Sequence, residues 1–221
     1  MHAPAVVSAL LCVVASNAAP AANGGSQQYC PSISPAYAAA VQNQFQTDMI
    51  VPDLIERINP TVGVNVAYNT ADQGSKAVQL GTYFTPEQTL TMPTLNFTAE
   101  QKYDPYSTNY TYFLVDPDVP QDGSMVQVNF LHWMVSHAQP NCVPNQKQDT
   151  VVTYQPLTPA STTQHRYTFL VYREPQGFNP DADLTLQART PFDLNDYTQD
   201  NKLVLVGGNF LKEAIDNGVV G

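Results

Sequence analysis

The sequence has few charges, few cations and no long apolar segment. Of its 221 residues 13% are charged, and 9 lysines and arginines against 19 aspartates and glutamates give a formal net charge of −10. Such an acidic chain repels phosphate backbones, so we expect no nucleic-acid partner. No apolar run approaches the roughly 20 residues of a membrane-spanning helix, so we expect no membrane span. The hydrophobic content of 43% is enough for one packed domain.

The chain also lacks the short motifs of common enzymes. It contains no nucleophile elbow, no glycine-rich phosphate loop and no metalloprotease helix motif. These absences argue against the usual hydrolase and nucleotide-binding classes. Any chemistry must come from residues that the fold brings together.

The first apolar segment has the features of a secretory signal peptide. Residues 5–15 are apolar, and small residues at Ser16 and Ala18 follow. The region before it carries no lysine or arginine, and the alternative is a buried terminal helix or strand. We predict a signal peptide over residues 1–18 and a single domain over 19–221, secreted or retained in the lumen of the secretory pathway.

The number of cysteines agrees with secretion. Of three cysteines, Cys12 would leave with the signal peptide, so Cys30 and Cys142 remain. Two cysteines in a secreted chain predict one disulfide, with two free thiols as the alternative. Asn96 and Asn109 each begin an Asn-X-Thr sequon, which predicts glycosylation if the chain enters the secretory pathway.

Most of the mature chain has the alternation of β-strands. Ser34-Pro35 predicts the start of a helix that ends near Asp48, and from Val62 to Tyr68 every second residue is apolar. Proline and glycine turns separate the other strand-like runs. We predict a mainly β sandwich of antiparallel sheets with a few short helices. The remaining expected strands are 77–84, 94–98, 109–115, 126–135, 150–154 and 165–173, and late helices are expected after Thr190-Pro191 and over 210–217.

Three polar clusters lie in or beside apolar strands. Asp116-Pro117-Asp118-Val119-Pro120 follows an apolar strand, where the prolines would hold the carboxylates at a stiff corner. Taken alone, this motif is more often an ordinary acidic turn than a functional site. His132 and His165 each lie in an apolar strand, and each by itself is more often a satisfied core residue than a functional one.

Together these residues resemble the phosphatidylethanolamine-binding protein (PEBP) family, which includes Raf kinase inhibitor proteins, plant flowering regulators and fungal carboxypeptidase inhibitors. The resemblance rests on the 116–120 motif, on His132 before a hydrophobic strand, and on His165-Arg166-Tyr167. Weaker agreement covers most of the mature chain. The polar, uncharged composition makes secreted fungal PEBP-like proteins the most similar members.

The resemblance implies a β-sandwich with a small anion-binding pocket at one end. Phe130 stands where many members have tryptophan, and Phe210 appears in place of a second aromatic hydroxyl. No cofactor is implied. A metal site built from two histidines and one carboxylate is conceivable but is not expected. The implied ligand-binding residues are Asp116, Asp118, Phe130, His132, Pro159, His165 and Tyr167, of which His132, His165, Asp116 and Tyr167 would be the catalytic residues of any enzyme.

Three classes of function follow from the resemblance. The first is a binder of a small anionic metabolite. Because some fungal relatives occur in polyketide pathways that join maleic-anhydride units, the resemblance extends this class to an auxiliary enzyme that uses the same residues to assist the coupling of such monomers, together with other pathway enzymes. The second is a binder of phospholipid headgroups. The third is an inhibitor of a carboxypeptidase or serine protease, without catalytic activity. Whether the protein is an enzyme stays open at this stage.

Overall fold

The computed structural model describes residues 30–121, 126–159, 162–180 and 189–215. The predicted signal peptide, residues 1–18, lies outside the described residues, so its cleavage stays a prediction. Within the described ranges, no helix is long and apolar enough to cross a membrane.

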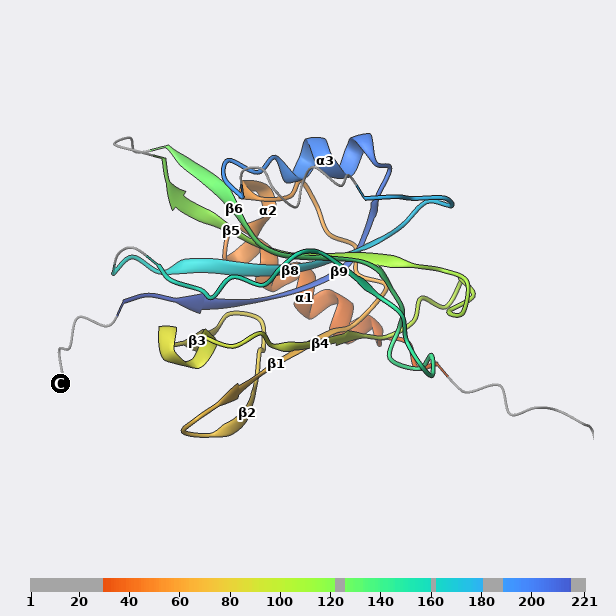
Figure 1. Ribbon diagram of the computed structural model, residues 1–221, viewed down its shortest axis with the longest axis horizontal. Coiled ribbons are helices and arrows are strands. Elements are labelled where there is room, and N and C mark those ends of the chain that lie inside the picture. The colour runs from red at the N-terminus through yellow and green to blue at the C-terminus, as the bar shows by residue number, and fades with distance from the viewer. Residues whose placement is uncertain (1–29, 122–125, 160–161, 181–188, 216–221) are drawn as a thin grey trace, which may run out of the picture.

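Two sheets and a layer of helices build the molecule (Figure 1). Strands pair antiparallel throughout, except that β3 runs parallel to β9. The smaller sheet has the order β2-β1-β4, with β1 Val64–Thr70, β2 Gly74–Ala77 and β4 Thr94–Phe97. The larger sheet has the order β3-β9-β8-β5-β6-β7, with β3 Thr82–Phe84, β5 Tyr110–Pro120, β6 Gln127–Ala138, β7 Asp149–Val152, β8 His165–Arg173 and β9 Val204–Glu213.

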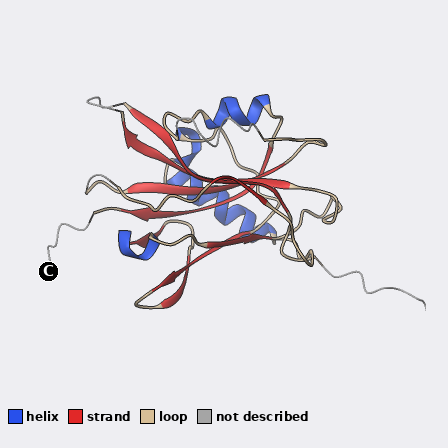
Figure 2. Cartoon of the chain, viewed as in Figure 1, coloured by secondary structure: helices blue, strands red, loops and turns tan. Residues whose placement is uncertain are grey.

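The helices are few and short, and α3 lies outside the strands at the top of the view (Figure 2). Ser34 caps α1 as the sequence predicts, because its hydroxyl accepts a hydrogen bond from the backbone N–H of Tyr37. The third helix begins later than expected, since Asp193 and not Thr190 is its N-cap. The helical segments are α1 Pro35–Thr47, α2 Ile50–Asp53, the 3₁₀ helix η1 Pro86–Thr89 and α3 Leu194–Asp200.

Each face of the larger sheet covers its own hydrophobic core. One core lies between the sheets and includes Val66 of β1 and Leu114 of β5. The other lies between the larger sheet and the helices and includes Phe45 of α1 and Phe113 of β5. The alternation along β5 therefore places successive side chains in different cores. The predicted mainly β sandwich with few short helices is confirmed.

Two of the predicted elements were wrong. The expected strand 77–84 is interrupted, because Leu80 and Gly81 adopt φ values of 34° and 93°. A Cβ at Gly81 would lie 3.0 Å from the Phe210 ring, so this turn needs glycine. The expected helix over 210–217 is wrong in its described part: β9 continues to Glu213, because pairing with β8 and β3 overrides the local helical pattern, and residues 216–217 lie outside the described residues.

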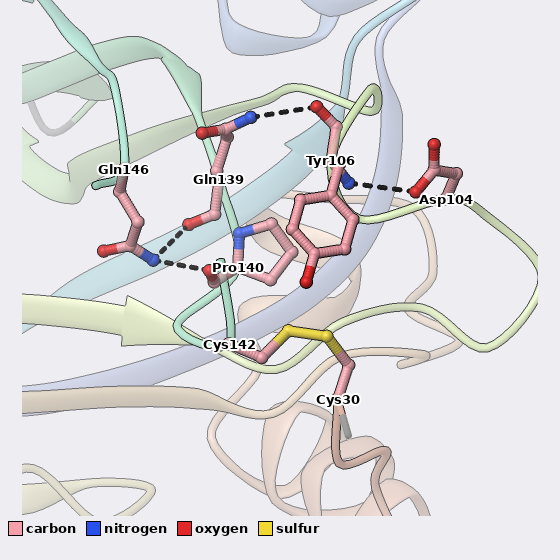
Figure 3. The surroundings of a disulfide bond; sticks show 7 residues. All are labelled: Cys30, Asp104, Tyr106, Gln139, Pro140, Cys142 and Gln146. Atoms are coloured by element: carbon pink, nitrogen blue, oxygen red, sulfur yellow. Dashed lines mark hydrogen bonds between the residues drawn. A yellow bond between two sulfur atoms is a disulfide. The ribbon is translucent and has the colours of Figure 1, made fainter. Parts of the chain in front are cut away.

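A disulfide joins Cys30 to Cys142, the pair that the cysteine count predicts (Figure 3). It links the segment before α1 to the loop after β6, 112 residues away. The Gln146 side-chain amide closes the same loop, since it donates to the carbonyl oxygens of Gln139 and Pro140 at 2.9 and 2.5 Å (Figure 3). The N-terminal segment is thereby fixed to one end of the larger sheet.

The two predicted glycosylation sites differ in exposure. Asn96 is exposed on β4. Asn109 is half-buried, and Thr111 of its sequon is fully buried, with its hydroxyl donating to Glu174 at 2.7 Å. Glycosylation of either site stays a prediction, and Asn96 is the more accessible of the two in the folded chain.

Candidate functional site

A bulge in β5 places the first carboxylate. The 116–120 motif was predicted to be a corner after the strand, but β5 continues through it to Pro120. The register with β6 shifts between Asp116, opposite Phe130, and Val119, opposite Val128. The bulge lets the Asp116 carboxylate accept a hydrogen bond from the backbone N–H of Asp118 at 2.8 Å. Asp116 is consequently fixed by its own strand.

Asp116 also binds His165, the first residue of β8. The His165 Nδ1 atom lies 2.7 Å from Asp116 Oδ2, and both side chains are buried. Burial by itself lowers the pKa of His165, but the hydrogen bond and the negative charge of Asp116 outweigh it, so the pKa is raised. Nδ1–H donates to the carboxylate, and in the protonated ring Nε2–H is a second donor.

The pKa of His132 is shifted in the opposite direction, downwards. Its Nδ1 lies 3.0 Å from the carbonyl oxygen of Gln155, which can only accept, so Nδ1 carries the hydrogen. Burial is the main cause that lowers the His132 pKa below the usual 6.5. The neutral ring therefore has a hydrogen-bond acceptor at Nε2.

The two histidines line one small pocket. Its volume is about 150 Å³. Burial and the neighbouring Asp116 charge raise the pKa of Tyr167 well above its usual range, so its hydroxyl keeps its proton. The Phe130 ring lies 4.6 Å from the His132 ring and covers one side of it. The described lining residues are Asp116, Val119, Pro120, Phe130, His132, Gln155, Thr158, His165 and Tyr167.

Two residues of the predicted set lie outside this lining. Asp118 is held by Arg166, whose backbone N–H, Nε and Nη2 donate to its carboxylate at 2.7, 2.9 and 2.6 Å. Arg166 also binds Asp53 of α2 at 2.9 Å. Asp118 therefore orients β8 and α2 and does not reach the pocket. Pro159 is buried beside Thr158, which takes the lining position.

Phe210 does not stand in for a pocket hydroxyl. Its ring packs 5.6 Å from Phe45 of α1, in the core on the helical face of the sheet. The pocket is on the other face, where Tyr167 and its cross-strand neighbour Leu211 lie. A register difference of one residue moves a side chain through the sheet, and the sequence by itself does not fix that register.

The sequence also missed several residues at or near the pocket. Gln155 and Thr158 lie in a segment without strand or helix, so no periodic pattern marks them. The Arg189 guanidinium donates to the carbonyl oxygens of Leu131 and His132 at 3.1 and 3.0 Å, and so supports the backbone under His132. Among the described residues, no group of three or more His, Cys, Asp or Glu side chains is placed to hold a metal ion.

Comparison with known proteins identifies similar sequences. A family model described as phosphatidylethanolamine-binding protein matches residues 74–212. A "26 kDa secreted antigen" of Toxocara canis is 34% identical over 136 residues, which cover 61% of this chain and 47% of the antigen. The chain thus spans about half the length of that relative. "CEN-like protein 1" of Nicotiana tabacum is 28% identical over 70% of this chain and 81% of its own.

Solved structures share the fold at lower identity. A carboxypeptidase Y inhibitor, crystallised with its cognate proteinase, superposes with a TM-score of 0.65 at 20% identity, covering 83% of this chain and 98% of its own. A phosphatidylethanolamine-binding protein from Plasmodium vivax gives a TM-score of 0.60 at 19% identity, covering 80% and 98%.

Proposed function

Because the chain belongs to the phosphatidylethanolamine-binding protein family, and because its pocket brings together two histidines whose pKa values are shifted in opposite directions, we propose that it binds a small phosphate or carboxylate anion there. The observation that carries the proposal is the pair of ring contacts. His165 is held by Asp116, and His132 by the Gln155 carbonyl. Each contact uses Nδ1 and leaves Nε2 for a ligand.

The two Nε2 atoms suit an anion that keeps one proton. When His165 is protonated, its Nε2–H donates to an anionic oxygen, and the neutral His132 ring accepts from a protonated oxygen of the same group. A hydrogen phosphate has both kinds of oxygen. Phe130 and the buried Tyr167 limit water in the pocket, which strengthens these hydrogen bonds.

Anion affinity should rise as the pH falls. The pKa of His132 is depressed, so its ring gains a proton only on the acid side of the usual 6.5. The protonated ring then donates from Nε2 and adds a positive charge. Fully deprotonated anions such as dicarboxylates should gain most from this change, because they have no proton to give to neutral His132.

Calorimetric titration with phosphate and with a dicarboxylate tests the proposal. His165→Ala should weaken binding by about 1–3 kcal/mol, the usual scale of a charge-assisted hydrogen bond. His137→Ala is the matched control, since it removes another histidine that is paired with a carboxylate, outside this pocket. Equal affinity of the wild type and His165→Ala would place the anion elsewhere.

If the protein is secreted, as we propose, its ligand is extracellular or lies in the lumen of the secretory pathway. The disulfide and the similarity to a protein described as a secreted antigen both fit passage through the secretory pathway. Cleavage after Ala18 should be visible in the intact mass of protein from a secreting host. The retention of Met1 together with two alkylatable thiols would contradict secretion.

A phospholipid headgroup and a soluble anion share this chemistry. Binding of the full lipid would place apolar chains outside a pocket of only about 150 Å³. Vesicles with and without phosphatidylethanolamine, compared with soluble phosphoethanolamine, distinguish the two sources. A soluble headgroup that binds as tightly as vesicles would favour the soluble ligand.

Protease inhibition is a second candidate, favoured by the similarity to the carboxypeptidase Y inhibitor. In that case the pocket would not take part in inhibition. Addition of the purified chain to a serine carboxypeptidase, with His165→Ala as the comparison, separates the two functions. Inhibition that survives the substitution would assign the inhibitory surface to another part of the chain.

If the pocket is also catalytic, the reaction that we propose for it is the coupling of maleic-anhydride units. Neutral His132 would take a proton, and His165 and Tyr167 would donate to the developing oxyanion. Dimer formation from anhydride monomers, followed by mass spectrometry, tests this reaction. A His132→Ala/His165→Ala double variant with wild-type yield would eliminate catalysis at this pocket.

A further inference from the structure

Glu213 is a buried carboxyl that the anion pocket does not contact directly. It is the last residue of β9, and its exposed fraction is 0%. Its Oε2 atom accepts a hydrogen bond from the Thr89 hydroxyl at 2.8 Å, and Oε1 has no hydrogen-bond partner among the residues that the structure describes. A carboxylate with a single donor in a buried position is strongly disfavoured in its charged form.

The sheet register places Glu213 directly behind the pocket. Glu213 is opposite His165 in the antiparallel β8–β9 pair, and neighbouring side chains in such a pair lie on the same face about 5 Å apart at Cβ. Tyr167 and Leu211 form the next pair on that face. Glu213 is therefore adjacent to His165, which donates its Nδ1–H to Asp116.

Charged and titratable groups from several elements surround this carboxyl. Lys212 points to the other side, where it binds Asp48, and Lys76 lies over the Phe84 ring and donates to Gln88. Both lysines therefore have partners of their own, and the positive charge that acts on the Glu213 pKa is that of His165. The groups around Glu213 are His165 and Tyr167 from β8, Asp116 from β5, Tyr68 from β1, Tyr154 after β7 and Glu87 from η1.

These surroundings keep a proton on Glu213 at neutral pH. Burial is the largest cause and, together with the charges of Glu87 and Asp116, raises the pKa of Glu213 to about 8. The Thr89 hydrogen bond and the His165 charge act in the opposite direction but are outweighed. The proton is therefore retained at neutral pH and leaves in the mildly alkaline range.

We propose that Glu213 is a positioning residue whose proton couples to anion binding in the adjacent pocket. This inference rests on the proposed anion-binding function. A bound anion adds negative charge next to His165 and Asp116, so the neutral form of Glu213 becomes more favourable. Where Glu213 is partly ionised, anion binding is accompanied by the uptake of a fraction of a proton from solvent onto its carboxylate, equal to the rise in its average protonation. By linkage, the protonated carboxyl favours the anion to the same extent.

Sulfate is a suitable probe because it stays a dianion throughout the range of about pH 6 to 9, so every proton taken up on binding goes to the protein. Like a dicarboxylate it has no proton to give to neutral His132, so its affinity should fall towards the alkaline end of this range. Calorimetry in two buffers with different ionisation heats measures how many protons accompany binding. At about pH 8, near the Glu213 pKa, the wild type should take up a few tenths of a proton more than Glu213→Gln. At about pH 6 the two proteins should bind sulfate within about twofold, because Glu213 is then neutral in both.

A second variant keeps the carboxyl in place. Thr89→Val removes the hydroxyl that donates to Glu213, so the Glu213 pKa should rise and the maximum of proton uptake should move to higher pH. The matched control is Glu174→Gln. The Glu174 side chain is also buried, but it binds Thr111 and the backbone of His137 near the other end of β5. This control should leave the proton uptake unchanged.

The outcomes are distinct. Reduced uptake in Glu213→Gln and shifted uptake in Thr89→Val support the coupling. Wild-type uptake in Glu213→Gln overturns it and assigns the proton to His165, while the proposed anion binding stands. Loss of sulfate binding by folded Glu213→Gln at about pH 6 also overturns it. A wild type that binds none of sulfate, phosphate or the dicarboxylate overturns the proposed function, and the coupling with it.

Discussion

The larger sheet carries a histidine–carboxylate pair at each end, and the two pairs have nearly the same length. His165 Nδ1 lies 2.7 Å from Asp116, and His137 Nδ1 lies 2.8 Å from Asp149. Their surroundings differ. At the first pair both side chains are at most 4% exposed, whereas Asp149 is 72% exposed.

The two histidines also differ in what their second ring nitrogen, Nε2, contacts. Nε2 of His137 contacts the Phe178 carbonyl at 3.2 Å and lies 3.9 Å from the Glu174 carboxylate, so the ring joins three chain segments. No described residue bonds Nε2 of His165, which lines the pocket. The same pair of side chains is therefore structural at one end of the sheet, and at the other end it leaves an atom for a ligand.

The largest expected effect concerns the disulfide, which sits beyond the His137 end of the sheet. Cys30→Ser/Cys142→Ser opens a cross-link between residues 112 apart in sequence. The variant should lose about 4–5 kcal/mol of unfolding free energy on the chain-entropy model, measured by urea denaturation. A loss below about 1 kcal/mol would mean that packing, and not the cross-link, holds this end.

Asp116→Asn breaks the buried pair. It should lower the unfolding free energy by about 3 kcal/mol, because it removes one partner of a buried ion pair and leaves His165 without its counter-charge. The His165 pKa should then fall, since burial remains and the opposing carboxylate is gone. Urea unfolding and a ring-proton NMR titration measure the two effects. An unchanged His165 titration would show that Asp116 does not set its charge.

Asp149→Asn breaks the exposed pair and should cost no more than about 1 kcal/mol. The pKa of His137 is raised in the folded state, where the Asp149 and Phe178 hydrogen bonds and the Glu174 charge outweigh the effect of burial. The stabilisation is thus fully present below the unfolded pKa of about 6.5 and is lost as the pH rises through the folded value. Urea unfolding of both proteins at several pH values should show a difference only on the acid side. A difference in unfolding free energy between the two proteins that grows with pH would contradict a raised His137 pKa in the folded state.

The smallest perturbation is a titration of the unmodified protein. NMR should show the His165 and His137 rings titrating above the usual value of about 6.5 and the His132 ring below it. Since burial lowers the folded pKa of His132 below its unfolded value of about 6.5, the fold is more stable above that value than at acid pH, and this stability is lost as the pH falls from about 6.5 through the lower folded pKa. A His132 ring that titrates with the other two would remove the electrostatic asymmetry of the pocket.

The sequence predicted much of the fold because local patterns carried it. The structure has the elements that local patterns predicted: the helix capped by Ser34, the alternating strand β1, and the strands β5, β6 and β8. The prediction was wrong where pairing overrides local preference. The end of β9 has a helical pattern but is held as a strand by β8 and β3.

The sequence by itself determined which residue types the pocket has. Asp116, His132, His165 and Tyr167 stand out in it because polar side chains in apolar strands are unusual. Tertiary structure decided the rest. The β5 bulge places the Asp116 carboxylate against His165, whereas the Asp118 carboxylate binds Arg166 outside the pocket. The register of β9 places Glu213 behind the pocket and Phe210 on the other face of the sheet. These outcomes depend on long-range strand register, where a shift of one residue exchanges the faces of a sheet, and no local pattern encodes it.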